Sequence, residues 1–444
     1  MNSLLKSTLL LSTAVSALEK LDTIQKPLIR DACPSNSILN NGECQPSSTL
    51  LADISLHQNI TQQTLQQSYE SARQTPNFPW TYWPLCYSNE NTTEPYCVFS
   101  SQEFASGRGI FIVSSADKAY EILKKPAFSD PEALSRINNH ANPPFIQHEF
   151  PGKGRGLVAN KTLHRGDQIF ASTPLLITNP NSYLLSETER LALVHRGVET
   201  LPEKSKPLFW ALLDHFKGDA VDDRINTNAF EININGELQH AVLPEIAMLN
   251  HDCRPNAAYF WDEDTLSHYV HATQTIYPGE EITITYINNE RVRSKRVKNL
   301  EANWGFQCSC SSCAAHPEFV SQSDARIKQM LSIIDKLNDW TSDSEATPEM
   351  AELLIALYTQ ERLDASLGIP YKHAAEAYAS FGDRWQATRF ARLAVEFLTL
   401  DKGWGDSDVA EMEKMATEPE MTWSWRKRVG HKRLEGVSGC GHAH

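Results

Sequence analysis

The chain has 444 residues, a length sufficient for two to four domains with their own cores. Its formal net charge of -14 argues against a nucleic-acid backbone as the main partner and favours basic proteins or peptides. No stretch after the N-terminal segment is long and apolar enough for a membrane helix, so no membrane partner is expected.

The first residues have the pattern of a secretory signal peptide, which we place at residues 1–17. Lys6 closes a short polar start, residues 7–14 are mostly apolar, and the small residues Val15, Ser16 and Ala17 offer a cleavage site. This predicts the secretory pathway or secretion. The alternative is an ordinary N-terminus of a protein of the nucleus or cytoplasm.

Residues 18–142 are expected to form a loop-rich region that contains disulfides. Cys33 and Cys44 are separated by ten residues, as are Cys86 and Cys97. In an oxidising compartment two disulfides are reasonable, although spacing alone does not decide their connectivity. Within this region, residues 97–99 and 107–113 are predicted as short strands and residues 116–124 as a helix.

The central part of the chain, residues 143–287, mixes extended and helical patterns. The segment GKGRGLVA at 152–159 predicts a glycine-rich turn that enters a strand, and residues 163–170 predict a second strand. No Lys-Ser or Lys-Thr follows the glycines, so they do not form a phosphate loop. A helical insert is expected at about 181–225, with extended structure resuming at 226–232.

Residues 317–435 have an almost wholly helical pattern, and residues 436–444 are expected to be a disordered tail. Helices are predicted at 325–337, 350–366, 372–381 and 385–398. The alanines of the last two helices are typical of a helical hairpin like a tetratricopeptide unit. A generic helix pair that packs on the preceding domain explains them equally well.

Four late cysteines carry the tight spacing of metal ligands: Cys253, Cys308, Cys310 and Cys313. Short spacings let one loop wrap an ion, while the remote Cys253 ties that loop to another segment. Four protein sulfurs leave no open position for water, so the zinc would be structural, in a segment at 288–316. Disulfides between these cysteines are the competing interpretation.

Three motifs around these cysteines resemble those of the SET-domain protein lysine methyltransferases. They are NHDCRPN at 250–256, GEEITITY at 279–286 and GFQCSCSSC at 305–313, and they follow residues 152–159, which match the family's opening hairpin. The chain is most similar to the SET-and-MYND branch, but it has no cysteine between Cys97 and Cys253 for a MYND finger. The resemblance implies an α+β fold with small twisted sheets, a knot-like crossing, a post-SET zinc segment and a helical C-terminal region.

The resemblance also implies an S-adenosylmethionine site and assigns residues to it. Asn250 and His251 would hold the cofactor, and the pocket would be completed by Lys153, Gly154, Arg155, Asn228 and Phe306. Tyr286 matches the active-site tyrosine, which also faces the cofactor at the mouth of a lysine channel. Trp304 occupies a position where the branch often has a second channel aromatic.

The function implied is methyl transfer from S-adenosylmethionine to a lysine ε-amine of a histone or another basic protein. Two alternatives stay open at this point. One is a catalytically inactive SET fold that serves as a protein-binding module. The other is a secreted protein stabilised by disulfides, in which the late cysteines are oxidised.

Overall fold

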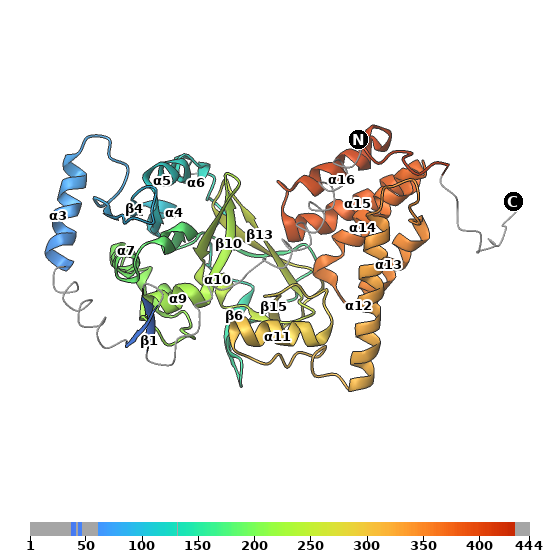
Figure 1. The fold of residues 1–444 in the computed structure, drawn as a ribbon, viewed down its shortest axis with the longest axis horizontal. Coiled ribbons are helices and arrows are strands. Elements are labelled where there is room, and N and C mark those ends of the chain that lie inside the picture. Colours follow the sequence, from blue (N-terminus) through green and yellow to red (C-terminus); the bar gives the residue numbers. More distant parts are fainter. Residues whose placement is uncertain (1–36, 41–42, 47–60, 131, 431–444) are drawn as a thin grey trace, which may run out of the picture.

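The computed structural model describes residues 37–40, 43–46, 61–130 and 132–430. The predicted signal peptide, Cys33 and the tail at 436–444 lie outside these residues. The sheets all lie in the first two thirds of the described chain, where helices alternate with them, and the last third is helical (Figure 1). This arrangement confirms the α+β class. No helix of the described part meets the length and apolarity that a membrane crossing requires.

The largest sheet has six strands in the order β10-β11-β9-β5-β4-β3. Its strands are β3 (Leu85–Tyr87), β4 (Tyr96–Ser101), β5 (Ile110–Ser114), β9 (Leu176–Thr178), β10 (Ala229–Ile234) and β11 (Glu237–Val242). Strands β5 and β9 run parallel, and the other neighbours are antiparallel. The expected boundary at 142 therefore passes through one sheet, because the N-terminal region supplies half of its strands.

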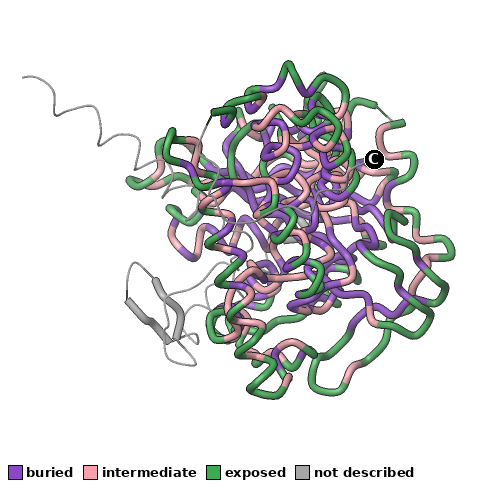
Figure 2. The backbone as a smooth tube through the Cα atoms, turned by 90° about the vertical axis from the view of Figure 1, so that its right-hand side faces the viewer, coloured by how far each residue is buried: buried purple, intermediate pink, exposed green. Residues whose placement is uncertain are grey.

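Both faces of this sheet are covered by apolar side chains. Phe99 and Ile112 belong to the core shared with the central strands, whereas Val98 and Phe111 pack against α7 (Glu187–Thr200). Because side chains alternate along a strand, continuous apolar runs in β4 and β5 fill both cores. Figure 2 shows the resulting distribution, with buried segments inside and exposed segments around them.

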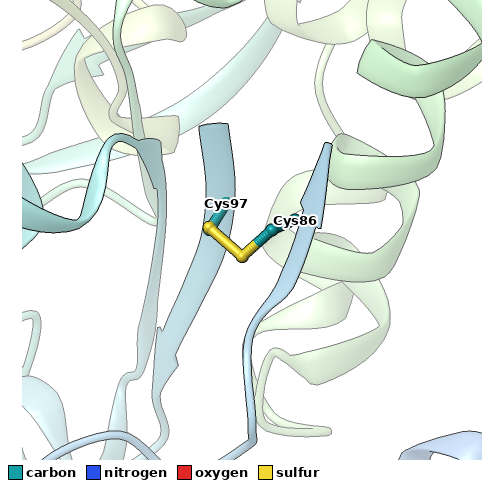
Figure 3. The surroundings of a disulfide bond; sticks show 2 residues. All are labelled: Cys86 and Cys97. Atoms are coloured by element: carbon teal, nitrogen blue, oxygen red, sulfur yellow. A yellow bond between two sulfur atoms is a disulfide. The ribbon is translucent and has the colours of Figure 1, made fainter. Parts of the chain in front are cut away.

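A disulfide joins Cys86 on β3 to Cys97 on β4, where the two residues are directly paired (Figure 3). One of the two expected disulfides is thus present. The other pairing stays a prediction, because Cys33 is not described. The region is also less loop-rich than expected, since it contains α3 (Thr61–Gln74), α4 (Phe104–Gly107), α5 (Ala116–Leu123) and α6 (Pro126–Ser129), besides β1 (Ser37–Asn40) and β2 (Glu43–Pro46).

The glycine-rich hairpin forms between β6 (Phe145–Phe150) and β7 (Gly154–Ala159). Gly152 and Gly154 have φ values of 76° and 77°, which a turn made of residues with side chains would rarely adopt. The second predicted strand, seen as β8 (Gln168–Ser172), does not pair with β7 but with β14 (Ser267–Ala272), which pairs in turn with β13 (Ala257–Asp262).

The helical insert consists of short helices rather than one long one. Helix α7 begins with a capping box formed by Ser186 and Glu189, and the chain then continues through α8 (Lys206–Trp210) and α9 (Ala220–Asn228). The prediction of extended structure from residue 226 was wrong by three residues. The Asp219 carboxylate caps α9, and Asn226 donates to Asp222 inside it, so the helix persists to Asn228. Two further short elements are η1 (Pro180–Leu184) and α10 (Pro244–Ala247).

The C-terminal helices pack around small residues. They are α12 (Pro317–Leu337), α13 (Pro348–Gln360), α14 (Gly368–Ser380), α15 (Arg384–Lys402) and α16 (Ser407–Thr417), with η2 (Asp364–Ser366) and η3 (Pro419–Met421) between and after them. Ala374, Ala387 and Ala391 are fully buried, as the alanine pattern predicted. Sequence reasoning missed α16 and also α11 (Arg293–Trp304), which precedes the late cysteines. The likeness to a tetratricopeptide unit stays a prediction.

Helix α15 packs on β13, so the helical part is placed against the three-stranded sheet. Trp404 lies edge-on to Phe260 and Tyr269 of that sheet, with ring centroids 4.8 and 4.9 Å apart. These contacts position the C-terminal helices beside the segments that carry the SET-like motifs (Figure 1).

Candidate functional site

A parallel pairing of two short strands brings the central motifs together. Strand β12 (Asn250–His251) lies beside β15 (Glu281–Ile284), with Asn250 opposite Thr283, and β15 also pairs with β7. The side chain of Asn256 secures this crossing: it accepts from the amide of Thr283 and donates to the carbonyl of Glu281, both at 2.8 Å. Sequence reasoning gave Asn256 no such role.

A cavity of about 220 Å³ lies next to this crossing. All but one of the residues predicted for the cofactor and the lysine channel line it: Lys153, Gly154, Arg155, Asn228, Asn250, Tyr286, Trp304 and Phe306. Its remaining walls are largely apolar and come from residues 211–213, 215–216, 227, 229–230 and 246–248. The cavity thus combines apolar walls with a few polar groups, as small-molecule sites commonly do.

His251 is the predicted cofactor residue that does not line the cavity. Its buried ring accepts from the Tyr286 amide at Nδ1, 3.0 Å away, and its Nε2 lies 3.4 Å from the sulfur of Cys253. Burial lowers the pKa of His251 to about 3, so the ring is neutral near pH 7. With Nδ1 acting as acceptor, the proton resides on Nε2 and points to the sulfur. His251 therefore connects the tyrosine backbone to the cysteine cluster.

Tyr286 has its hydroxyl group at a defined position. The hydroxyl donates to the carbonyl oxygen of Leu249 over 2.6 Å, and the ring lies 5.6 Å from that of Trp304. Burial raises the pKa of Tyr286 above its usual value, so the phenol is protonated at neutral pH. Because its proton is used in this bond, the oxygen presents a lone pair to any donor that enters the cavity.

Glu281 joins two of the predicted residues, and sequence reasoning did not assign it a role. One carboxylate oxygen accepts from the Asn250 amide and the other pairs with the Lys153 ammonium, each at 2.8 Å. Gly156 faces the same group: a Cβ there would lie 2.5 Å from Nδ2 of Asn250. Only glycine fits this close approach without a shift of Asn250.

The segment 211–217 forms one wall of the cavity and was also missed. Arg155 donates to the carbonyl of Ala211, and Asn228 donates to that of Leu213 at 2.8 Å. The buried carboxylate of Asp223 accepts the amides of His215, Phe216 and Lys217. No local sequence signal identifies this wall, because its partners lie on other elements, β7 and α9.

The four late cysteines form a single cluster. Their sulfur atoms lie within 4.8 Å of one another, and Cys253 and Cys313 are 3.5 Å apart. A tetrahedral zinc ion with four thiolates requires sulfur separations of about 3.8 Å. The cysteines are unbonded to each other in the structure, so their arrangement fits a structural zinc site better than disulfides.

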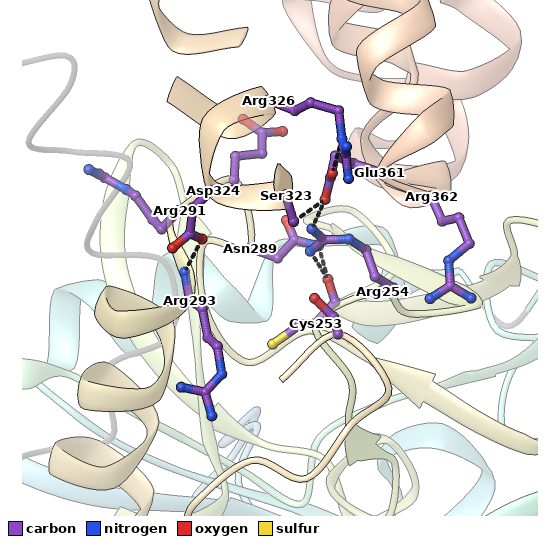
Figure 4. A network of polar contacts seen from close by, with 12 residues as sticks. Cys253, Arg254, Asn289, Arg291, Arg293, Ser323, Asp324, Arg326, Glu361 and Arg362 are labelled. Atoms are coloured by element: carbon purple, nitrogen blue, oxygen red, sulfur yellow. Dashed lines mark hydrogen bonds and ion pairs between the residues drawn. The ribbon is translucent and has the colours of Figure 1, made fainter. Parts of the chain in front are cut away.

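A buried ionic network ties this cluster to the C-terminal helices (Figure 4). Arg254, the residue after Cys253, donates to the carbonyl of Cys253 at 2.8 Å and to the Glu361 carboxylate at 2.6 Å. Glu361 also accepts from Ser323 and Arg326. Burial alone would raise the pKa of Glu361, but hydrogen bonds from these three residues hold it below its usual value.

Residues 154–287 match the SET domain family. The chain carries a SET domain. This match covers β7, the insert and the two strands that cross beside the cavity, and it confirms the resemblance read from the motifs at 250–256 and 279–286. The cysteine motif at 305–313 lies outside the matched residues.

The SET domain has curated relatives among lysine methyltransferases. The chain is 30% identical over 188 residues to the histone-lysine N-methyltransferase set5 of Schizosaccharomyces pombe. The aligned region covers 40% of this chain and 54% of that protein. It is 33% identical over 113 residues to the N-lysine methyltransferase SMYD2-A of Danio rerio, or 25% of each chain. It is 42% identical to the mouse protein-lysine N-trimethyltransferase SMYD5 over 72 residues, which are 16% of this chain and 17% of that one. The chain thus spans about half or less of the length of the relatives it matches.

Proposed function

We propose that this protein is an S-adenosylmethionine-dependent protein-lysine N-methyltransferase. The observation that carries the proposal is the position of Tyr286, whose hydroxyl is fixed by Leu249 on the wall of a cavity that Asn250 also lines. The relatives named above, which are lysine methyltransferases, support the same reaction.

The lining residues fit S-adenosylmethionine, which would supply a methyl group on a positively charged sulfur. Lys153 and Arg155 offer positive charge for its carboxylate, and Asn250 offers a polar side chain beside them. Asn228 and the ring of Phe306 lie at the same cavity and would contact the adenosine part. His251 would act from outside the cavity, by holding the Tyr286 backbone in place.

The side chains at the cavity would promote transfer by orientation and by exclusion of water. In-line methyl transfer needs the lysine amine uncharged and aligned, and it needs no strong base in the active site. The rings of Tyr286 and Trp304 would desolvate the substrate ammonium and lower its pKa. The Tyr286 oxygen would then accept a hydrogen bond from the lysine amine. This bond would direct the lone pair of the amine nitrogen to the methyl group.

We also infer one structural zinc ion per chain, held by Cys253, Cys308, Cys310 and Cys313. The substrate would be a histone or another basic protein, in agreement with the net charge of -14. The compartment stays a prediction from residues 1–17.

Calorimetric titration with S-adenosylmethionine tests the proposal directly. The wild type should bind the cofactor, and Asn250→Ala should weaken binding about tenfold or more, because a buried polar contact is lost. The matched control is Asn139→Ala, since Asn139 is exposed and does not line the cavity. No binding to the folded wild type would reject the enzyme in favour of a silent SET fold.

Tyr286→Phe separates binding from catalysis. The variant should bind the cofactor as the wild type does but lose most methyl transfer to a mixture of histones, because only the hydroxyl is removed. Unchanged turnover would reject the role assigned to the hydroxyl.

A further inference from the structure

A second cavity, of about 310 Å³, lies in the N-terminal part of the structure and shares no lining residue with the one beside Tyr286. Its walls come from α4 and the turn after it, from the segment at 134–138 and from residues 204–208. The proposed methyltransferase reaction gives it no role.

The charged side chains on this cavity are all cationic. Arg108 and Lys204 line it, and no aspartate or glutamate does. The Lys204 ammonium is held over the turn by the carbonyl of Ser106, 3.1 Å away. A cavity with two cations and no lining acid favours a negatively charged ligand.

Arg108 is buried and its hydrogen-bonding capacity is only partly used. The residue is 7% exposed, and its Nη2 donates to Glu245 at 2.8 Å. Its Nε is buried and has no acceptor among the described residues. A guanidinium with unused donors is stabilised by a further acceptor, so an anion that reaches the exposed remainder of Arg108 from the cavity would be bound favourably.

The backbone around the cavity is unusual for residues that carry a side chain. Ala105 and Ser106 have φ values of 51° and 57°, and Asn138 on the opposite wall has 58°. Left-handed conformations at such residues persist where the surrounding structure enforces them, and they concentrate at ligand sites. Asn138 is held in this way by Thr173, which exchanges hydrogen bonds with its side chain.

The remaining wall is apolar. Ala105, Leu134, Ile137 and Leu208 line the cavity, and Leu208 is 36% exposed. A ligand that places a charged head near Arg108 and Lys204 would therefore cover these side chains with an apolar body.

Arg108 also connects this cavity to the one beside Tyr286. Its partner Glu245 lies on α10, and the next residues, Ile246, Ala247 and Met248, line the other cavity. A ligand that draws Arg108 away from Glu245 would therefore act on α10, whose residues Ile246 and Ala247 line the other cavity.

We propose that the cavity beside Arg108 is a second ligand site, which takes a small organic anion with a carboxylate head and an apolar body. Its head binds Arg108 and Lys204, and its body covers Leu134, Ile137 and Leu208. The site is independent of methyl transfer and exists whether or not the proposed enzyme activity does.

Calorimetric titration of the full chain with hexanoate tests this site, with inorganic phosphate as a second arm. Hexanoate should bind saturably with a Kd of about 10 mM or below, as its few heavy atoms allow. Lys204→Ala should weaken it about five- to tenfold, because one charged contact is lost. Phosphate, which has no apolar body, should bind more weakly than hexanoate.

Lys206→Ala is the matched control, because Lys206 carries the same charge two residues away, pairs with Glu203 at 2.6 Å and does not line the cavity. Leu134→Trp should abolish hexanoate binding by filling the cavity, while circular dichroism melting shows that each variant folds. The proposal is overturned if the folded wild type binds no hexanoate, if phosphate binds more tightly, or if Lys206→Ala weakens binding as much as Lys204→Ala.

Discussion

The guanidinium of Arg254 and the carboxylate of Glu361 meet at 2.6 Å, with each side chain only 4% exposed. Arg254 directly follows Cys253 of the four-cysteine cluster, and Glu361 directly follows α13 of the C-terminal helices. One buried contact therefore joins the SET domain motifs to a part of the chain that the family match does not include (Figure 4).

Replacing Glu361 by alanine should destabilise the protein by about 3 kcal/mol or more, because Arg254 would be left buried without its counter-ion and the half-buried Arg326 would lose its partner. Urea unfolding at pH 7 measures the loss. The control is Glu396→Ala, which removes an exposed pair with Arg165 and should cost at most about 1 kcal/mol. Equal losses of stability in the two variants would show that breaking the buried pair costs no more than breaking the exposed one, which would contradict the prediction.

Zinc should be present at one equivalent per chain and should be lost in Cys310→Ser, because four thiolates complete the tetrahedral site. A colorimetric zinc assay after denaturation checks the stoichiometry. S-adenosylmethionine binding should fall in the same variant, since Cys253 lies three residues from Asn250. Cys440→Ser provides the same substitution outside the cluster and should retain both zinc and binding.

Gly156→Ala should weaken cofactor binding about tenfold, because the added Cβ would lie 2.5 Å from Nδ2 of Asn250 and 2.8 Å from the ring of Phe150. Calorimetry with S-adenosylmethionine is again the measurement. In Gly405→Ala, where a Cβ meets nothing within 4 Å, affinity should be unchanged. A Gly156→Ala protein with wild-type affinity would show that Asn250 is free to move.

Stability should fall between pH 6.5 and pH 5 partly because of His268. Burial lowers its pKa to about 3, so below about pH 6.5 the unfolded chain binds a proton that the folded chain does not. Protonation of His268 in the unfolded chain should lower the free energy of unfolding by on the order of 2 kcal/mol at pH 5 relative to pH 7. Unfolding free energies of the wild type and His268→Leu at both pH values test it. The variant should lose less stability on acidification, and an identical loss would refute the effect.

Much of the site could be predicted from single segments of the chain. Residues 250–256 carry both Asn250 and Cys253, and three more cysteines lie within residues 308–313. Local spacing is sufficient to indicate a metal cluster and a polar turn beside it. The strands β4 and β5 were also visible as apolar runs, because a strand buried on both faces needs them.

Other features depended on contacts between distant segments. Strands were predicted at 152–159 and 163–170 without their partners, and in the structure β7 pairs with β6 and β15 whereas β8 pairs with β14. Strand partners are chosen by packing across the whole core, and periodicity in one segment carries no information about them. For the same reason the wall at 211–217 and the link through Glu281 were not foreseen.

The sequence by itself determined the chemistry of the groups: four thiols, a phenol, an Asn-His turn and the glycines that let the backbone pass close to Asn250. Only the tertiary structure decided their arrangement. It turned the ring of His251 away from the cavity and toward Cys253, because its nitrogens find partners there. It also placed Glu361 against Arg254, where burial makes a single ion pair bind two parts of the chain together.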